Sequence, residues 1–244
     1  MLATLNRGLR AILAVCLLAL AWPAAGASFS ISPVRIELSA QETTSAVTVT
    51  NTGDEPVSVQ LRVFSWRQEA NEDRLEPTRD LVATPPVFSV PPGESQIVRI
   101  GLRRPPQGTV EVPFRAIFEE IPGPPPPSGG PALRINLRIS VPVFYAPAED
   151  LKSVLSWKFS RQTPGQLRLT VRNAGSASAH VGDLAVATAI GAPPIAEQKN
   201  FAYVLPGAER SFTINVPAAD SNNTRLQLRT TLDGQRTEIE VPVE

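Results

Sequence analysis

The sequence is poor in the side chains from which most metal sites and nucleophilic active sites are built. Its 244 residues include one cysteine, one histidine and one methionine. Cys16 lies in the N-terminal apolar segment, so the rest of the chain can form neither a disulfide nor a reactive thiol. A zinc site would need carboxylates around His180 alone, which is a poor ligand set. We therefore expect no metal and no cofactor, and we expect stability to come from a buried hydrophobic core.

Long apolar runs are also missing. The longest, residues 11–21, is too short for a membrane-spanning helix. It follows Arg7 and Arg10 and precedes the small residues at 25–27, an arrangement that is typical of a secretory signal peptide. We predict a signal peptide over 1–27 and a mature chain that is exported and has no integral membrane segment.

Neither sign of charge predominates in this chain. It contains 23 Lys and Arg and 23 Asp and Glu. Removal of the signal peptide removes two arginines and no acid, which leaves 21 basic and 23 acidic side chains and a net charge of −2. Such a near-neutral balance argues against nucleic acid as a partner.

Arrangements of catalytic residues are absent as well. His180 is not accompanied by a Gly-x-Ser-x-Gly sequence that would supply a serine nucleophile. Glu119 and Glu120 are adjacent on a predicted strand, so they point to opposite faces and cannot share one site. The glycines at 129–130 lie in a proline-rich loop with no helix after them, which argues against a phosphate-binding loop. We predict that the chain is not an enzyme.

What the sequence does contain is short apolar–polar alternation with a period of two residues, and its 25 prolines suit strand ends and turns better than helices. In the first half, strands are predicted at 29–38, 46–51, 57–66, 81–89, 96–102, 112–121 and 132–145. In the second half, they are predicted at 153–160, 166–172, 180–189, 201–204, 209–216, 224–232 and 235–243. Between the two series the pattern breaks at 146–150.

Seven or so short strands in each half are typical of an immunoglobulin-like β-sandwich of roughly 100 residues. We therefore predict an all-β protein that consists of two tandem immunoglobulin-like β-sandwich domains. The N-terminal domain is expected at 28–147 and the C-terminal domain at 148–244, on either side of the break in the pattern.

The most regular alternation lies in residues 133–143, after the loop rich in proline and glycine. Leu133, Ile135, Leu137 and Ile139 fall on one face of the predicted strand, and mostly polar residues fall on the other. A row of apolar side chains this long must be covered. The cover is either the protein's own core, as for most alternating strands, or an incoming chain that pairs with an accessible edge. The residues alone leave both interpretations open.

Several segments, taken in this order along the chain, carry a family resemblance. The chain resembles the periplasmic pilus and fimbrial chaperones of the chaperone–usher type over essentially its whole mature length, and most strongly in the first domain. The segments that carry the resemblance are 31–38 (ISPVRIEL), 47–52 (VTVTNT), 83–100 (ATPPVFSVPPGESQIVRI), 114–122 (FRAIFEEIP) and 141–147 (VPVFYAP).

The resemblance implies a protein of the periplasm that binds and caps pilus subunits and delivers them to an outer-membrane usher. Such a subunit is a sandwich that lacks its last strand, and the last strand of the chaperone's first domain fills the open groove. By position, the donor side chains would be Leu133, Ile135, Leu137 and Ile139. The alternative function is a structural or adhesive tandem sandwich that caps no subunit. The sequence leaves open whether the unloaded chain associates with itself.

The resemblance also implies a basic site, between the two domains, that binds the terminal carboxylate of the subunit. Arg35 matches the family's arginine on the first strand, and a guanidinium suits a carboxylate. The family's second basic residue stands three positions before the tyrosine of the Phe-Tyr motif, where this chain has Pro142. This departure indicates a divergent branch of the family. Arg99 is the first candidate for the second basic residue, and Arg138 is the alternative.

Overall fold

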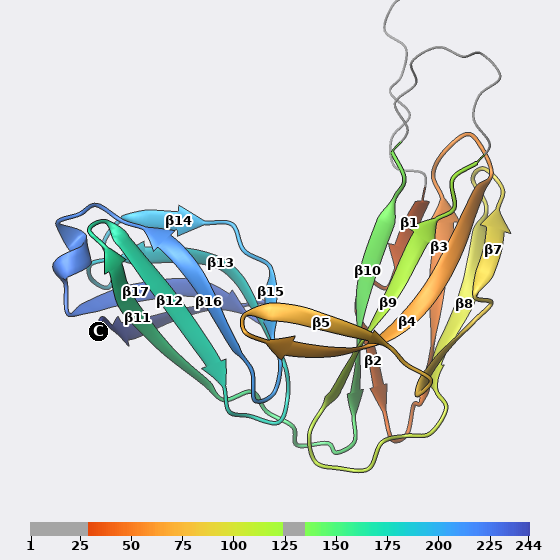
Figure 1. Cartoon of the computed structure of the whole chain (residues 1–244), viewed down its shortest axis with the longest axis horizontal. Helices are drawn as coiled ribbons and strands as arrows, with labels where there is room; N and C mark the ends of the chain where they lie inside the picture. Colours follow the sequence, from red (N-terminus) through yellow and green to blue (C-terminus); the bar gives the residue numbers. More distant parts are fainter. Residues whose placement is uncertain (1–28, 124–134) are drawn as a thin grey trace, which may run out of the picture.

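The structure is a computed structural model that describes residues 29–123 and 135–244. The predicted signal peptide and the predicted donor residue Leu133 lie outside the described residues. Apart from one short 3₁₀ helix at Asp220–Asn222, the regular elements of the described residues are β-strands. They form two sandwiches that follow one another along the chain, as predicted (Figure 1).

The first domain consists of two sheets packed face to face around one hydrophobic core. One sheet has the order β1-β3-β8-β6, with β1 at Phe29–Ser32, β3 at Thr44–Asn51, β8 at Ser95–Leu102 and β6 at Leu81–Thr84. The other has the order β2-β10-β9-β4-β5, with β2 at Ile36–Ser39, β10 at Arg138–Ala146, β9 at Val112–Glu120, β4 at Val57–Glu69 and β5 at Glu72–Pro77. A short strand, β7 at Val87–Val90, also pairs with β4. Phe29, Val98, Phe118 and Val143 are among the buried side chains of this core.

Two predicted strands are interrupted by proline. The predicted strand 29–38 is β1 followed by β2, because Pro33 has no N–H for the sheet ladder and the chain changes sheets there. The predicted strand 81–89 is likewise divided by the prolines at 85–86 into β6 and β7, which also belong to different sheets. The first break matters for the site, because it is β2 that pairs in parallel with β10.

The second domain is also a sandwich of two sheets. One has the order β11-β12-β16, with β11 at Leu155–Thr163, β12 at Gln166–Asn173 and β16 at Glu209–Asn215. The other has the order β14-β13-β17-β18, with β14 at Ala196–Gln198, β13 at Ala179–Ala187, β17 at Arg225–Leu232 and β18 at Gln235–Pro242. The short β15 at Ala202–Val204 pairs with β13. The predicted domain boundary at 147/148 falls between the end of β10 and the start of β11.

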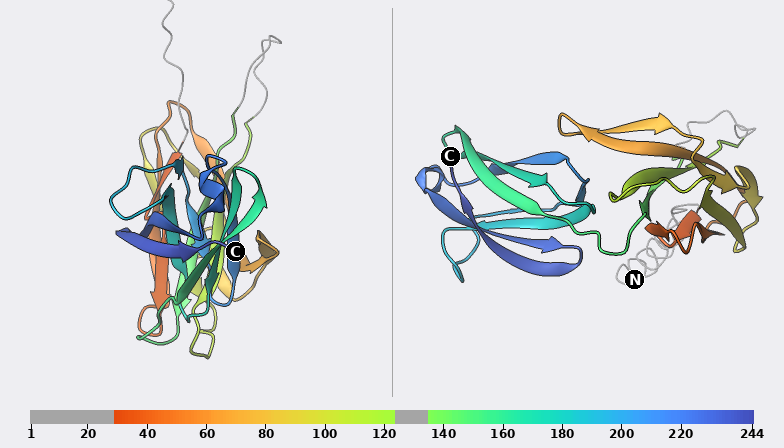
Figure 2. Two further views of the ribbon diagram at one scale, coloured as in Figure 1. Left: turned by 90° about the vertical axis from the view of Figure 1, so that its left-hand side faces the viewer. Right: turned by 90° about the horizontal axis from the view of Figure 1, so that it is seen from below.

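The domains are joined by the linker 147–154 and also contact each other elsewhere, among other places through the long β4–β5 hairpin. The hairpin turns at Ala70 and Asn71, both of which have positive φ, at 49° and 68°. Positive φ at both central residues suits a tight hairpin turn, and asparagine tolerates it well. Figures 1 and 2 show the hairpin reaching from the first domain to β15 and β16, apart from the linker.

Two kinds of feature are not found within 29–123 and 135–244. No helix there has the length and apolar character needed to cross a membrane. No three His, Cys, Asp or Glu side chains of that region come together in a group that could hold a metal ion.

Candidate functional site

The last strand of the first domain, β10, has one edge that is only partly paired. On one side it pairs with β9 from Arg138 to Tyr145. On the other side it pairs with β2 only over Val143–Ala146. Among the described residues, the edge over 138–142 therefore has no strand partner. Such an edge presents backbone N–H and C=O groups to an incoming strand.

The predicted donor side chains become more exposed toward the start of this strand. Ile139 and Leu137 are partly buried at the rim of the first-domain core. Ile135 precedes the strand and is 79% exposed. Leu137 is held on β9 through Glu120, whose N–H donates to the Leu137 carbonyl at 2.9 Å and whose carboxylate accepts from the Leu137 N–H at 3.1 Å. The segment ahead of β10 thus exposes the apolar side chain of Ile135, and its backbone is fixed two residues later by the hydrogen bonds between Leu137 and Glu120.

Two arginines flank one point on the outer face of the same sheet. β2 begins at Ile36, which lies opposite Val143, so Arg35 comes next to Pro142 across the strands. On the other side, the partner of Pro142 on β9 is Arg115. Side chains at opposed positions of neighbouring strands lie on one face of a sheet. Pro142, where the resemblance calls for a basic residue, is therefore flanked by guanidinium groups from both adjacent strands.

The guanidinium of Arg35 is partly buried and held by three side chains. Its Nε donates to the Glu37 carboxylate at 2.8 Å, and its Nη1 donates to the hydroxyl of Tyr203, a residue of the second domain, at 3.4 Å. Its Cζ lies 4.6 Å from the ring centroid of Phe144, a cation–π distance. Burial by itself lowers the pKa of Arg35, but Tyr203 and Glu37 outweigh it and the pKa is raised. Arg35 is therefore a fixed cation.

Arg115 is a second cation in an aromatic environment. Its Cζ lies 3.7 Å from the ring centroid of Trp66 and 5.9 Å from that of Tyr203. Burial lowers the pKa of Arg115, and the nearby Asp73 carboxylate partly offsets this. Asp73 is itself ion-paired with Arg210, and within the described ranges Arg115 has no ion-pair partner of its own. A partly buried guanidinium that shares its nearby carboxylate with Arg210 is suited to pair with an anionic ligand.

Both arginines lie against an aromatic cluster that the two domains share. Trp66 and Phe144 come from the first domain, Tyr203 and Leu205 come from the second, and all four are buried. The three ring centroids are between 5.2 and 5.9 Å apart, within the range of favourable aromatic pairs. The cluster therefore places the arginine pair at the junction between the domains.

The structure does not bring the other candidate arginines to this point. Arg99 lies on β8, in the other sheet of the first sandwich, with its side chain exposed. Arg138 is exposed at the start of β10, four residues before Pro142. The basic residue that does accompany Arg35 is Arg115. Sequence reasoning missed it because the match depends on the register between β9 and β10, which a single sequence does not display.

Two further titratable groups lie at the junction. The ring of His180 packs on Phe201 and Tyr203, with centroids 4.2 and 5.1 Å away, and burial lowers its pKa. The carboxylate of Glu111, just before β9, accepts from the N–H of Ser178 at 2.9 Å and from the Ser178 hydroxyl. Burial raises the pKa of Glu111 although both hydrogen bonds act in the opposite direction. Glu111 thus joins the two domains with a carboxylate that is costly to keep charged.

The fold and the site agree with a known family. The family model that matches is that of pili and flagellar-assembly chaperones, PapD N-terminal domain, and the match covers residues 28–150. The chain belongs to this family. The resemblance to pilus and fimbrial chaperones is thereby confirmed, and the protein is a pilus-assembly chaperone by family membership.

Individual relatives support the same conclusion. The chain is 28% identical to the chaperone protein FimB/FhaD of Bordetella pertussis over 169 residues, which is 65% of this chain and 68% of that protein. It superimposes with a TM-score of 0.67 and 24% identity on a chain of the CsuC–CsuE chaperone–tip adhesion subunit pre-assembly complex, from archaic chaperone–usher Csu pili of Acinetobacter baumannii. That match covers 89% of this chain and all of the other.

A second solved structure is similar over the same extent. A chain of the complex between the SafA pilin and the SafB chaperone of Salmonella enterica superimposes with a TM-score of 0.61 and 18% identity, covering 90% of this chain and 98% of the other. At these identities the likeness concerns the fold. It confirms the prediction of two tandem immunoglobulin-like sandwich domains.

Proposed function

We propose that this chaperone lends the segment leading into β10 to an incomplete pilus subunit, as the missing strand of the subunit's sandwich. The observation that supports this most strongly is the edge over 138–142, which has no strand partner among the described residues, with Ile135 exposed three residues ahead of it. The proposed donor side chains are Leu133, Ile135, Leu137 and Ile139, which alternate along one face. The complexes of the structural relatives, with a tip adhesion subunit and with a pilin, support the class of partner.

The geometry favours a guest strand that runs parallel to β10. Because β2 pairs with β10 in parallel and begins at Ile36, a parallel guest along 138–142 would end where β2 begins. Its terminal carboxylate would then lie beside Arg35, with Arg115 across Pro142. An antiparallel guest would instead direct its amino end toward two guanidinium groups, which repel a positive charge. We propose Arg35 and Arg115, in place of Arg99, as the carboxylate anchor.

Apolar burial would supply most of the affinity. Each large aliphatic side chain that moves from water into a groove contributes about 1.5–3 kcal/mol. Of the described donors, Ile135 has the most to gain, because Leu137 and Ile139 are already partly buried. The carboxylate anchor would fix the register of the guest strand, because it holds the end of that strand in place. The register matters, since a slip of one residue would present Asn136 and Arg138 to the groove.

The place of action and the next partner are also part of the proposal. The predicted signal peptide over 1–27 supports export to the periplasm. The chaperone–usher pili named for the CsuC–CsuE complex support delivery to an outer-membrane usher. We therefore propose that the chaperone caps subunits in the periplasm and transfers them to such an usher.

Co-expression tests this function. The chain should form a stable one-to-one complex with a pilus subunit encoded near its own gene, measured by size-exclusion chromatography with light scattering. The variant that combines Arg35→Ala with Arg115→Ala should be folded but should yield much less complex. If the intact chain stays monomeric with every neighbouring subunit, the alternative of a structural or adhesive sandwich would gain.

A further inference from the structure

Tyr203 is the point at which the second domain reaches the arginine pair. Its hydroxyl accepts the hydrogen bond from Arg35 Nη1 at 3.4 Å. Its ring centroid lies 5.4 Å from Cζ of Arg35 and 5.9 Å from Cζ of Arg115. Within 29–123 and 135–244, no other second-domain side chain makes a hydrogen bond or a cation–π contact with either arginine. One phenol thus contacts both cations of the proposed anchor.

The contact restrains the guanidinium of Arg35. With Nε bonded to Glu37 and Nη1 bonded to Tyr203, the plane of the guanidinium is fixed. Its Nη2 has no acceptor among the described residues, so it can donate to a ligand. A side chain that is held before binding loses little rotamer freedom when the ligand arrives, and this preorganisation favours binding.

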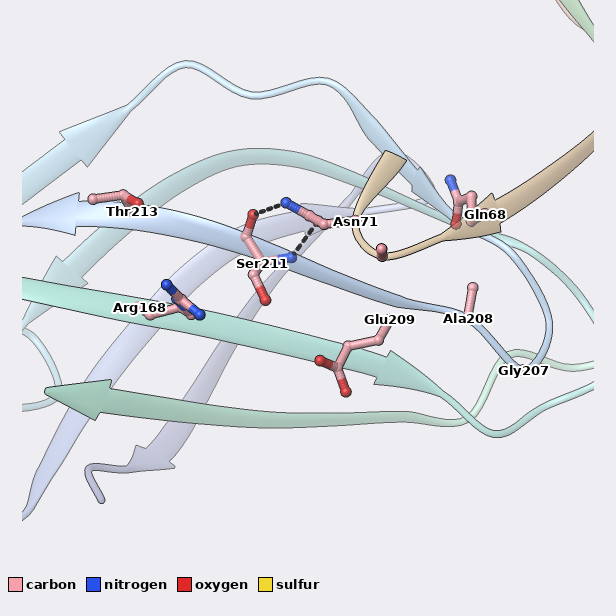
Figure 3. Close-up of a pocket in the computed structure, with 9 residues that line it drawn as sticks. Gln68, Asn71, Arg168, Gly207, Ala208, Glu209, Ser211 and Thr213 are labelled. Atoms are coloured by element: carbon pink, nitrogen blue, oxygen red, sulfur yellow. Dashed lines mark hydrogen bonds between the residues drawn. The ribbon is translucent and has the colours of Figure 1, made fainter. Parts of the chain in front are cut away.

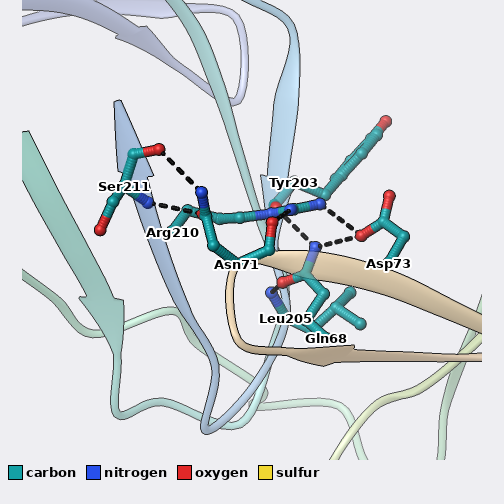
Figure 4. Close-up of polar contacts among 7 residues, drawn as sticks. All are labelled: Gln68, Asn71, Asp73, Tyr203, Leu205, Arg210 and Ser211. Carbon is teal, nitrogen blue, oxygen red and sulfur yellow. Dashed lines mark hydrogen bonds and ion pairs between the residues drawn. The ribbon is translucent and has the colours of Figure 1, made fainter. Parts of the chain in front are cut away.

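Tyr203 is in turn held by Gln68, near the end of the β4–β5 hairpin. The Gln68 side-chain amide donates from Nε2 to the Tyr203 carbonyl at 2.9 Å and accepts at Oε1 from the Leu205 N–H at 3.0 Å (Figure 4). A single side-chain amide therefore pairs with the backbone on both sides of Val204, as a neighbouring strand would. Its Nε2 also donates to the Asp73 carboxylate at 3.0 Å.

A second amide repeats this arrangement at the tip of the hairpin. Oδ1 of Asn71 accepts from the Ser211 N–H at 2.8 Å, and its Nδ2 donates to the Ser211 carbonyl at 3.2 Å. Arg210 donates to the Asn71 carbonyl and to the Asp73 carboxylate (Figure 4). Beside this contact lies a polar pocket, whose lining includes Asn71 of the hairpin tip and Arg168 of β12 (Figure 3). The hairpin thus binds the segment that carries Tyr203 through directional polar contacts.

We infer that Tyr203 is a positioning residue for the carboxylate site, and that the β4–β5 hairpin holds it there through Gln68. The second domain is then a fixed part of the site and not only an attached module. The inference rests on the proposed function, since it requires that Arg35 and Arg115 bind the carboxylate of a guest strand.

A peptide pair tests the inference. The probe is a synthetic 13-residue peptide of alternating valine and threonine with two lysines at its amino end, prepared once with a free terminal carboxylate and once as the amide. The full mature chain should bind the acid more tightly than the amide, as measured by calorimetry or by tryptophan fluorescence. Tyr203→Phe keeps the ring and removes the hydroxyl. It should lower the acid-over-amide preference about fivefold to tenfold and leave the amide's affinity unchanged.

Two further variants separate positioning from general damage. Gln68→Ala should lower the same preference although Gln68 contacts neither arginine. Tyr145→Phe alters the chain's other tyrosine, which is buried in the first-domain core, and should leave the preference unchanged. A Tyr203→Phe variant with the wild-type preference would overturn the inference. A wild-type chain that does not distinguish acid from amide would instead overturn the proposed carboxylate anchor.

Discussion

The exposure of Ile135 allows folding and subunit binding to be separated by one substitution. In the chain alone this side chain is 79% exposed, so Ile135→Asp removes few native contacts and should change the free energy of unfolding by no more than about 0.5 kcal/mol. In a subunit groove the lost burial amounts to about 2 kcal/mol, which is roughly 30-fold in affinity. The carboxylate would also be desolvated without a partner, at a cost of several kcal/mol more. Subunit capture by the Ile135→Asp variant should therefore fall below detection.

The assay compares melting temperature with the yield of co-purified subunit. Ile97→Asp is a matched control, because Ile97 is 56% exposed on β8 in the opposite sheet, and it should affect neither quantity. Ile135→Val should retain capture, since it keeps an apolar group in the groove. The reasoning fails if Ile135→Asp unfolds the isolated chain, which would make 135 a core position, or if this variant captures subunits normally.

Three further predictions follow from the junction and its surroundings. Arg115→Ala should reduce subunit affinity about tenfold and Arg99→Ala should not; equal effects in a pull-down would contradict the assignment of the anchor. The native state raises the pKa of Glu111, so its contribution to stability is present at low pH and lost as pH rises above about 4.3, the usual glutamate value. The Glu111→Gln variant should therefore have a higher melting temperature than the intact chain at pH 7. This difference in melting temperature should narrow toward pH 4.5, and a difference that does not depend on pH would refute the reasoning. Gly175→Ala should cost about 2 kcal/mol in a thermal melt, because its Cβ would clash with the backbone of 152–154; an unchanged melting temperature would show that this backbone can shift.

Alternation was sufficient to predict both sandwiches because most strands have one face in a core. In β4, for example, Val57 and Leu61 are buried and Arg62 is exposed. The same logic cannot find β5, because all six residues of Glu72–Pro77 are exposed and no burial pattern marks them. That strand forms because β4 turns back on itself at Ala70–Asn71. The hairpin reaches the second domain, so the junction that carries Tyr203 was beyond sequence reasoning as well.

Arg115 shows why the anchor was predictable only in part. The resemblance of one short segment, 31–38, was enough to identify Arg35. The second cation depends on which residues of β9 and β10 lie opposite each other, and the register places Arg115 opposite Pro142. A basic residue at 115 is displaced from one at 142 by a single strand spacing, about 4.8 Å, on the same face. A flexible cation on either strand can therefore reach one carboxylate beside Arg35.

Whether positions 115 and 142 are equivalent can be tested by moving the basic residue from 115 to 142. Arg115→Ala alone should weaken capture of a co-expressed subunit, and adding Pro142→Lys should restore most of the loss, because the new ammonium stands one strand nearer to Arg35. The matched control adds Arg99→Lys to Arg115→Ala, which places a lysine on the opposite sheet and should restore nothing. If Pro142→Lys fails to rescue a variant that melts like the intact chain, the register does not determine the anchor. The lost affinity would then reflect the packing of Arg115 on Trp66 and not its charge.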